Sequence, residues 1–153
     1  MSYTCETLVR PAQPVMSVRT RTPVQDLPNL IGVTYGKIME YLSGQGAAPS
    51  GAPFVAYYNM DMQDLDLEIG FPIAQPLPVS GSIQAGEMPA GEYAACLYTG
   101  PYEQLQVPYN ALQEYITGLG RTATGVAYEY YLNSPDQVLP EQLQTHILFP
   151  LQA

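Results

Sequence analysis

Alternating apolar and polar residues fill most of the chain, and this period of two predicts β-strands. Two longer stretches instead place apolar residues three or four positions apart, which predicts amphipathic helices. The first helix follows Asp26 and ends near Gly44, and the second begins near Leu105 and ends near Gly118. The predicted strands span residues 3–10, 15–22, 53–59, 65–73, 83–88, 91–99, 126–132 and 143–149. This mixture predicts an α+β fold.

The same order of elements occurs twice along the chain. A shift of 74 residues lays residues 35–46 over 109–120, with Tyr, Glu, Tyr, Gly and Gly at identical positions. A shift of 78 lays Pro23 over Pro101, and Phe71-Pro72 over Phe149-Pro150. Matches in a constant order indicate duplication. We therefore expect a single domain made of two β-α-β-β repeats, at about 1–73 and about 82–153, joined by a linker over 74–81.

Each repeat has one helix and about three strands, so its helix can cover only one face of its sheet. The uncovered faces of the two sheets can pack against each other, face solvent or bind a ligand. We expect a pseudo-two-fold antiparallel sheet of about eight strands around a central cleft, with two main helices on the outside. Ligand sites favour such interfaces.

An acid interrupts the aromatic strand at 126–132. Glu129 and Tyr131 share one side of this strand, because a strand alternates its faces, while Tyr128 and Tyr130 share the other. Burying a carboxylate among aromatic rings is costly unless something pairs with it. This side is therefore either solvated or meets a partner. Under the shift of 74, Val55 takes the place of Glu129, so the charge belongs to one half only.

The same alternation predicts further residues of the cleft. Glu68 faces away from the apolar side of its strand, and His146 faces away from Ile147 and Phe149. The expected ligand-binding set is Glu129, Tyr131, Tyr57, Glu68 and His146, with Tyr93 and Met16 as additional lining residues. The alternative for both acids is a solvated strand residue, and for His146 a structural role. Tyr98, Tyr102, Tyr109 and Tyr115 are expected in core packing.

The composition excludes several classes of function. Five basic against fourteen acidic residues give a net charge of −9, which disfavours nucleic acid as a partner. Cys5 and Cys96 are far apart in sequence and, with one histidine, match no metal spacing, so we expect no metal. No nucleotide-binding or serine-hydrolase motif is present, and we expect no cofactor. Neither a signal peptide nor a transmembrane segment is recognisable, which predicts a cytoplasmic protein with free thiols.

Four motifs together resemble the GyrI-like small-molecule-binding domains, which are also the effector-binding domains of BmrR-type and Rob-type regulators. The motifs are LEIGFPI at 67–73, YTGPYE at 98–103, YEYYLNSP at 128–135 and THILFP at 145–150. The resemblance implies a duplicated β-α-β-β fold around a cleft. It also implies that Glu129 matches a glutamate that binds lipophilic cations among aromatic side chains. Some relatives hydrolyse cyclopropane-bearing electrophiles, and others bind DNA gyrase. We expect no helix-turn-helix region, because the first repeat begins within the first two dozen residues, and the sequence contains no tryptophan.

These observations predict a stand-alone multidrug-binding protein for lipophilic, cationic aromatic compounds, with cation–π contacts from tyrosines. Whether it is also an enzyme is open. A hydrolase of strained electrophiles would use Glu129 or Glu68 to activate water, with Tyr131 assisting. A gyrase-inhibitor-like interaction protein is the other alternative. The natural ligand and the oligomeric state do not follow from the sequence.

Overall fold

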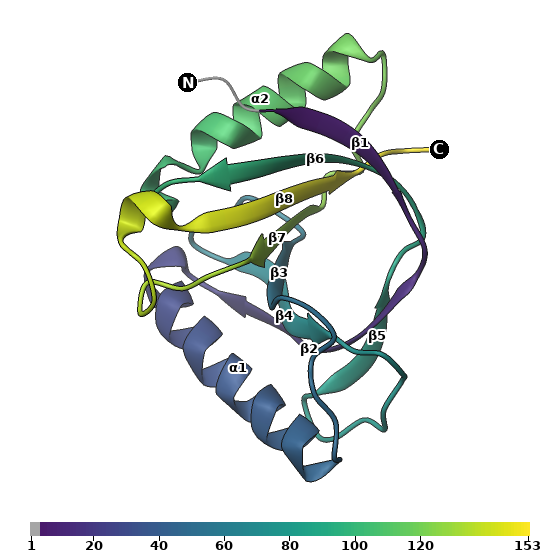
Figure 1. Ribbon diagram of the computed structural model, residues 1–153, viewed down its shortest axis with the longest axis vertical. Coiled ribbons are helices and arrows are strands. Elements are labelled where there is room, and N and C mark those ends of the chain that lie inside the picture. Colours follow the sequence, from purple (N-terminus) through teal and green to yellow (C-terminus); the bar gives the residue numbers. More distant parts are fainter. Residues whose placement is uncertain (1–3) are drawn as a thin grey trace. The chain divides into compact units, whose positions relative to one another are not determined.

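The computed structural model describes residues 4–153, and these form two compact units. The terminal unit combines the residues up to Pro11 with Ala90–Ala153, and the central unit is Ala12–Pro89. Each unit contains four antiparallel strands and one long helix (Figure 1).

The central unit has the strand order β3-β4-β2-β5. Its strands are β2 (Gln13–Thr22), β3 (Phe54–Tyr57), β4 (Leu65–Pro72) and β5 (Gln84–Met88). A 3₁₀ turn, η1 (Val24–Asp26), leads into helix α1 (Leu27–Gly44). The predicted hairpin is present, since β3 and β4 pair antiparallel around the turn at residues 58–64.

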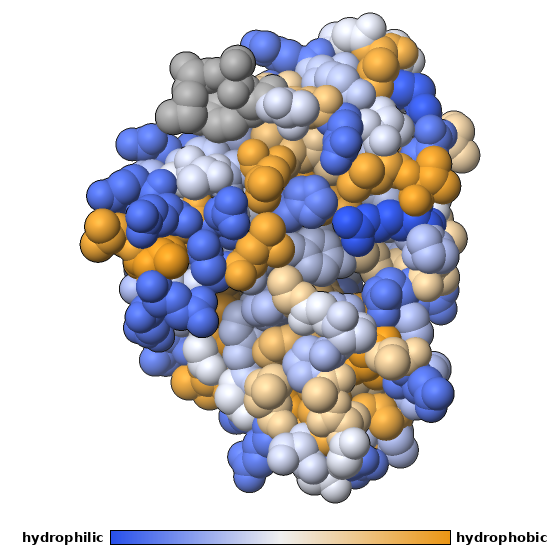
Figure 2. All heavy atoms as spheres, in the orientation of Figure 1, coloured by the Kyte–Doolittle hydropathy of each residue, from blue (hydrophilic) through white to orange (hydrophobic). Residues whose placement is uncertain are grey.

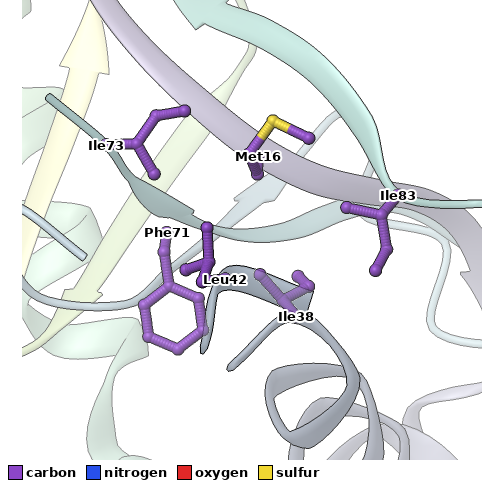
Figure 3. Packing of buried hydrophobic residues seen from close by; sticks show 6 residues of the cluster. All are labelled: Met16, Ile38, Leu42, Phe71, Ile73 and Ile83. Atoms are coloured by element: carbon purple, nitrogen blue, oxygen red, sulfur yellow. The ribbon is translucent and has the colours of Figure 1, made fainter. Parts of the chain in front are cut away.

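Helix α1 covers one face of this sheet because its buried positions recur every four residues. Ile38 and Leu42 are completely buried, and they pack against Met16 of β2 and Phe71 of β4. Ile73 and Ile83 complete this cluster (Figure 3). Burying each such side chain stabilises the fold by about 1.5–3 kcal/mol. The face of β4 that carries Leu65, Leu67, Ile69 and Phe71 therefore lies under the helix, as the alternation predicts.

The terminal unit has the strand order β1-β6-β8-β7. Its strands are β1 (Cys5–Arg10), β6 (Gly91–Thr99), β7 (Ala127–Tyr131) and β8 (Gln144–Pro150). Two 3₁₀ turns, η2 (Tyr102–Gln104) and η3 (Pro140–Gln142), precede helix α2 (Gln106–Gly118) and β8. Leu112 and Ile116 are the buried side of α2, and the Tyr115 hydroxyl bonds Thr7 of β1 at 3.1 Å.

The predicted α+β class, eight antiparallel strands and two main helices are confirmed. The two compact units do not coincide with halves of the sequence. Strand β1 lies at the start of the chain yet pairs with β6, and β5 lies after the midpoint yet pairs with β2. The repeat boundaries and the cleft between the repeats stay predictions.

Within residues 4–153, no helix is long and apolar enough to cross a membrane. On the face drawn in Figure 2, hydrophilic and hydrophobic side chains are interspersed. The exposed large hydrophobic residues are likewise spread over many elements, from Val9 of β1 to Leu139 before η3.

Candidate functional site

Glu129 lies in the middle of β7 and is buried, with only 5% of its surface exposed. Glu129 pairs with Ile147 of the neighbouring strand β8, and both side chains lie on the face of the sheet that α2 covers. Its two carboxylate oxygens accept hydrogen bonds from different tyrosines: Tyr131 on the same strand, at 2.8 Å, and Tyr109 on α2. In the described part of the chain, no Lys, Arg or His forms an ion pair with this carboxylate. Glu129 is thus a buried acid whose charge is not neutralised.

Aromatic rings from four elements surround this acid. The Tyr131 ring meets the edge of Tyr102 in η2, with centroids 5.8 Å apart. The Tyr109 ring packs edge-on against Phe149 of β8 at 5.2 Å. Tyr109 and Tyr102 therefore come from the segment that covers the sheet, and Tyr131 and Phe149 come from the sheet itself. The result is an acid enclosed by tyrosine side chains beneath α2.

Burial raises the pKa of the Glu129 carboxyl, and the hydrogen bonds from Tyr109 and Tyr131 oppose this effect only in part. The Tyr102 pKa is also raised, first by burial and then by the Glu129 charge. The folded protein consequently holds the proton on Glu129 more tightly than the unfolded chain does. The ionised form is stabilised only by neutral hydroxyl groups.

Tyr109→Phe is expected to raise the Glu129 pKa further, because it removes a donor that stabilises the carboxylate. We expect the shift to be upward, since a hydrogen bond donated to the carboxylate favours its ionised form. Carboxyl-carbon NMR titration of glutamate-labelled protein measures it directly.

Tyr115→Phe is the matched control, because Tyr115 lies on the same helix but bonds Thr7 instead of Glu129. It should leave the Glu129 titration unchanged. An unchanged titration in Tyr109→Phe would contradict the hydrogen-bond assignment.

A buried hydroxyl group lies on the same face of this sheet as Glu129. The Thr145 hydroxyl is completely buried and is the one buried side-chain oxygen or nitrogen of the described residues without a hydrogen-bond partner. Thr145 pairs directly with Tyr131 across β7 and β8, so both side chains face α2. Buried hydroxyls are normally hydrogen-bonded, and an exception requires an explanation. This layer therefore contains an unneutralised acid and an unpaired hydroxyl.

The central unit has the corresponding aromatic pair without the acid. Tyr35 of α1, which the shift of 74 aligns with Tyr109, packs against Phe71 at 5.1 Å. Its hydroxyl donates to the Phe54 carbonyl at 3.1 Å, because Val55 is fully buried at the position of Glu129. The predicted asymmetry between the repeats is confirmed: one covered face is charged and the other is apolar.

The prediction that His146 and Tyr93 share a face with Glu129 is wrong. Their strands pair so that His146 lies opposite Tyr130, whereas Glu129 lies opposite Ile147. Tyr93 meets the edge of Tyr128 at 6.2 Å on the face that points away from α2. Burial and the nearby Arg10 charge lower the His146 pKa, and Glu6 opposes them. A pairing register one residue away reverses a strand's facing, and sequence alone does not determine it.

In the central unit too, the candidate site residues lie on opposite faces of the sheet. Tyr57 pairs with Leu67 and so faces α1, whereas Glu68 pairs with Ala56 and Arg19 and faces away. Met16 is a core residue, fully buried under α1. The expectation that Tyr57 and Glu68 share one face is therefore wrong, and so is the placement of Met16 beside them.

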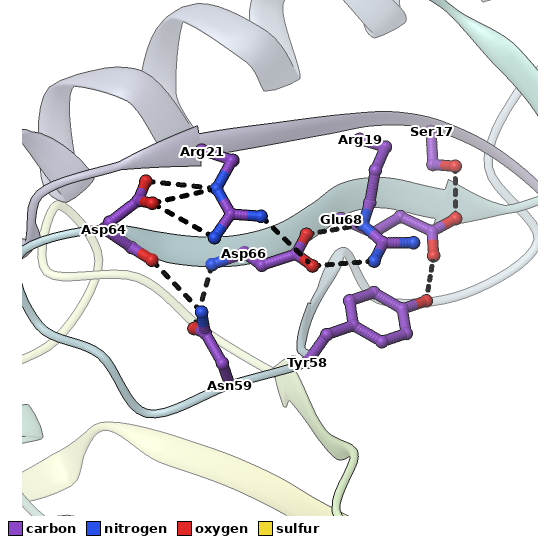
Figure 4. Close-up of polar contacts among 8 residues, drawn as sticks. All are labelled: Ser17, Arg19, Arg21, Tyr58, Asn59, Asp64, Asp66 and Glu68. Carbon is purple, nitrogen blue, oxygen red and sulfur yellow. Dashed lines mark hydrogen bonds and ion pairs between the residues drawn. The ribbon is translucent and has the colours of Figure 1, made fainter.

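Glu68 belongs to a polar network of its own (Figure 4). It accepts hydrogen bonds from Ser17 and Tyr58, each at 2.5 Å. Arg19 stacks over the Tyr58 ring at 3.7 Å and forms a bidentate ion pair with Asp66 at 2.7 and 2.9 Å. The hydrogen bond from Arg19 lowers the Asp66 pKa. With a guanidinium beside it, Glu68 is less suited than Glu129 to attract a foreign cation. Its ligand-binding role stays a prediction.

The sequence predicts core packing for Tyr109 and Tyr102, but the structure places both beside the pair formed by Glu129 and Tyr131. The spacing of Leu105, Tyr109, Leu112 and Ile116 contains a signal for Tyr109, because it puts this tyrosine on the inward side of the helix. Tyr102 precedes the helix and has no such signal.

No cluster of three or more histidine, cysteine or acidic side chains that could hold a metal ion occurs among residues 4–153. The arrangement around Glu129 offers one buried negative charge, several π faces and hydroxyl groups. This set suits an apolar cation and gives no ligand set for a metal.

Comparison with known proteins places the chain among small-molecule-binding domains. Residues 3–152 match the family described as "GyrI-like small molecule binding domain". No curated protein matches the sequence.

Three solved structures with similar folds are each at most 20% identical. EcmrR in complex with DNA has a TM-score of 0.86 at 20% identity; the match covers 98% of this chain but only 57% of that one. A hydrolase from Listeria innocua has a TM-score of 0.69 at 14% identity, covering 97% of this chain and 91% of that chain. SAV2435 bound to tetraphenylphosphonium has a TM-score of 0.67 at 12% identity, and the match covers 100% of this chain and 95% of that chain. These likenesses establish a common fold, and the family match over almost the whole sequence establishes that the chain belongs to the GyrI-like small-molecule-binding domains.

Proposed function

We propose that this protein binds lipophilic, cationic aromatic compounds at Glu129, in the layer between α2 and the sheet of the terminal unit. The observation that carries this proposal is the buried carboxylate without a cationic partner. A buried acid is costly unless it is paired, and a delocalised cation is itself easily removed from water. Such a ligand neutralises Glu129 at a small desolvation cost of its own.

The side chains around Glu129 suit an aromatic cation. The rings of Tyr102, Tyr109 and Tyr131 offer π faces, and a cation over a desolvated ring gains about 2 kcal/mol. The unpaired Thr145 hydroxyl offers a hydrogen bond to a polar substituent. Because the Tyr109 hydroxyl already bonds Glu129, a ligand that contacts the carboxylate replaces or shares this bond.

The family match supports small-molecule binding in general. The structurally similar SAV2435 binds tetraphenylphosphonium, which is a lipophilic aromatic cation. This compound is therefore a suitable first probe for the present chain.

Tetraphenylphosphonium is expected to bind more tightly as the pH rises through the raised pKa of Glu129, because ionisation creates the charge that the cation needs. Below this pKa the affinity should fall about tenfold per pH unit, since one proton must leave for each cation bound. Above it the affinity should be constant. Isothermal titration calorimetry over a pH series measures this dependence.

Tetraphenylborate is the matched control, since it has the same shape and the opposite charge. It should bind weakly at every pH and lose affinity as Glu129 ionises. Equal affinity for the two ions would mean that the site recognises shape alone, which would contradict the proposal.

Hydrolysis of strained electrophiles is the second candidate function. It is favoured by the direction of the Glu129 pKa shift, because a carboxyl group that holds its proton more tightly than usual is better suited to act as a general acid. Tyr131 is within hydrogen-bond distance of it and could assist. Mass analysis of cyclopropane-bearing compounds after incubation separates the candidates: a binding protein returns them unchanged, and a hydrolase adds water.

A further inference from the structure

The two cysteines, far apart in sequence, are direct neighbours across two strands of the terminal unit. Cys5 of β1 and Cys96 of β6 are register partners in the antiparallel pair, and these strands run side by side next to α2 (Figure 1). Both are free thiols. Opposite residues of antiparallel strands have Cα atoms about 4.5–5.5 Å apart, within the roughly 4.4–6.8 Å that a disulfide spans. The backbone therefore already has the spacing that a disulfide requires.

The side chains of this pair point toward each other. As register partners, Cys5 and Cys96 project their side chains to the same side of the sheet. Cys96 is the register partner of Ile147, and Ile147 is the register partner of Glu129. The two cysteine side chains therefore lie on the face of the sheet that α2 covers. The two sulfur atoms can approach without a change of strand pairing.

The two thiols differ in accessibility. Cys96 is 1% exposed, whereas Cys5 lies on the edge strand and is only partly buried. Burial raises the pKa of both thiols, that of Cys96 to about 12, while the hydrogen bond from Cys96 lowers that of Cys5. Cys5 is therefore the thiol that a reagent from solution meets first and that ionises first.

We propose that Cys5 and Cys96 form a reversible oxidation site, at which a small-molecule disulfide converts the two thiols into one cross-strand disulfide. The Cys5 thiolate attacks one sulfur of the reagent and forms a mixed disulfide, releasing the first small thiol. The Cys96 sulfur then attacks the Cys5 sulfur, loses its proton and releases the second small thiol. Two electrons pass from the protein to the reagent, and the two thiol protons end on the released thiols.

The disulfide holds the edge strand β1 to β6 in the layer that contains Glu129. Strand β1 is an edge strand whose strand neighbour is β6, so a covalent bond to β6 adds a restraint on its free side. A bond between residues 5 and 96 also closes a long loop of the unfolded chain, which favours the folded state. The inference rests on the strand register and does not depend on the proposed function.

The test incubates the native full chain with oxidised glutathione and follows its intact mass. The expected product has lost two hydrogen atoms, carries no glutathione and regains its original mass with dithiothreitol. Peptide mapping should identify Cys5 linked to Cys96 in one chain. The unfolding midpoint should rise by roughly 5–10 °C on oxidation.

Two variants separate the steps. The Cys96→Ala variant should accumulate the mixed disulfide, with one glutathione bound to Cys5. The Cys5→Ala variant should remain unmodified because Cys96 is buried. A wild-type protein that stops at the mixed disulfide, or keeps both thiols while the urea-unfolded chain reacts, overturns the proposal. Modification of Cys5→Ala at the wild-type rate also overturns it. The wild-type mapping decides the question even if either variant fails to fold.

Discussion

Glu129→Gln is expected to weaken tetraphenylphosphonium binding by roughly 100-fold at a pH above the raised pKa of Glu129, the equivalent of about 3 kcal/mol for removing one partner of a buried charge pair. Glutamine has nearly the same size, and its carbonyl oxygen can still accept a tyrosine hydrogen bond. The change therefore removes the charge and keeps the packing. The remaining affinity should also lose its pH dependence. Isothermal titration calorimetry measures both effects.

The same substitution should not destabilise the fold. The pKa of Glu129 is raised in the folded state, so its contribution to stability is greatest below the unfolded pKa of about 4.3 and is lost as the pH rises through the folded value. Binding of the cation changes in the opposite direction over this range. At a pH above the folded pKa of Glu129, the variant should thus bind poorly and unfold no more easily than the wild type. Urea unfolding of both proteins checks this combination.

Glu103→Gln provides the charge control. Glu103 is an exposed acid of η2, in the same unit and next to Tyr102, so this variant changes the net charge equally. We expect wild-type affinity. A similar loss of binding in both variants would mean that the overall negative field of the protein attracts the cation, and Glu129 would lose its special role.

Gly70→Ala is expected to lower the free energy of unfolding by about 3 kcal/mol, the upper part of the usual range for overpacking. Gly70 lies in β4 opposite Ser17 and Phe54. A Cβ atom there would be 2.5 Å from the Met16 carbonyl oxygen and 2.7 Å from the Ser17 Cβ. The backbone at Met16 cannot move aside cheaply, because β2 pairs on both sides. Chemical denaturation monitored by circular dichroism measures the loss.

Gly36→Ala is the opposite case in the same unit. Gly36 is exposed on α1, and a Cβ atom there meets nothing within 4 Å. Alanine is the better helix former, so stability should rise by about 0.5–1 kcal/mol. If Gly70→Ala proved as harmless as Gly36→Ala, the pairing of β2 with β4 at this point would be wrong.

Much of the fold follows from local sequence patterns. The alternation of apolar and polar residues predicts each strand to within a few residues, and the four-residue spacing of Ile38, Leu42, Leu112 and Ile116 predicts both helices and their buried sides. These signals are strong because burial acts on each element separately, whatever its partner. The shared Tyr35 and Tyr109 likewise indicate the same helix position in each repeat.

The site was only partly predictable. Glu129 and Tyr131 share a face simply because they are two residues apart on a strand, and the structure confirms it. His146 and Tyr93 are predicted to share the face of Glu129, but the pairing register of their strands places them on the opposite face. Met16 is predicted to line the site, but it lies in the core under α1. For Tyr109 the sequence predicts core packing, because nothing in its own segment indicates that its hydroxyl meets an acid twenty residues away.

The sequence by itself determined the α+β class, the duplication and the presence of a single acid in an aromatic strand, because each depends on spacing within one segment. Tertiary structure alone decided that α2 covers Glu129, that Tyr109 bonds it, and that Cys5 lies opposite Cys96. These facts depend on strand register and on which helix packs over which face. Both are set by the sum of many weak contacts between distant segments, and no single stretch of sequence encodes them.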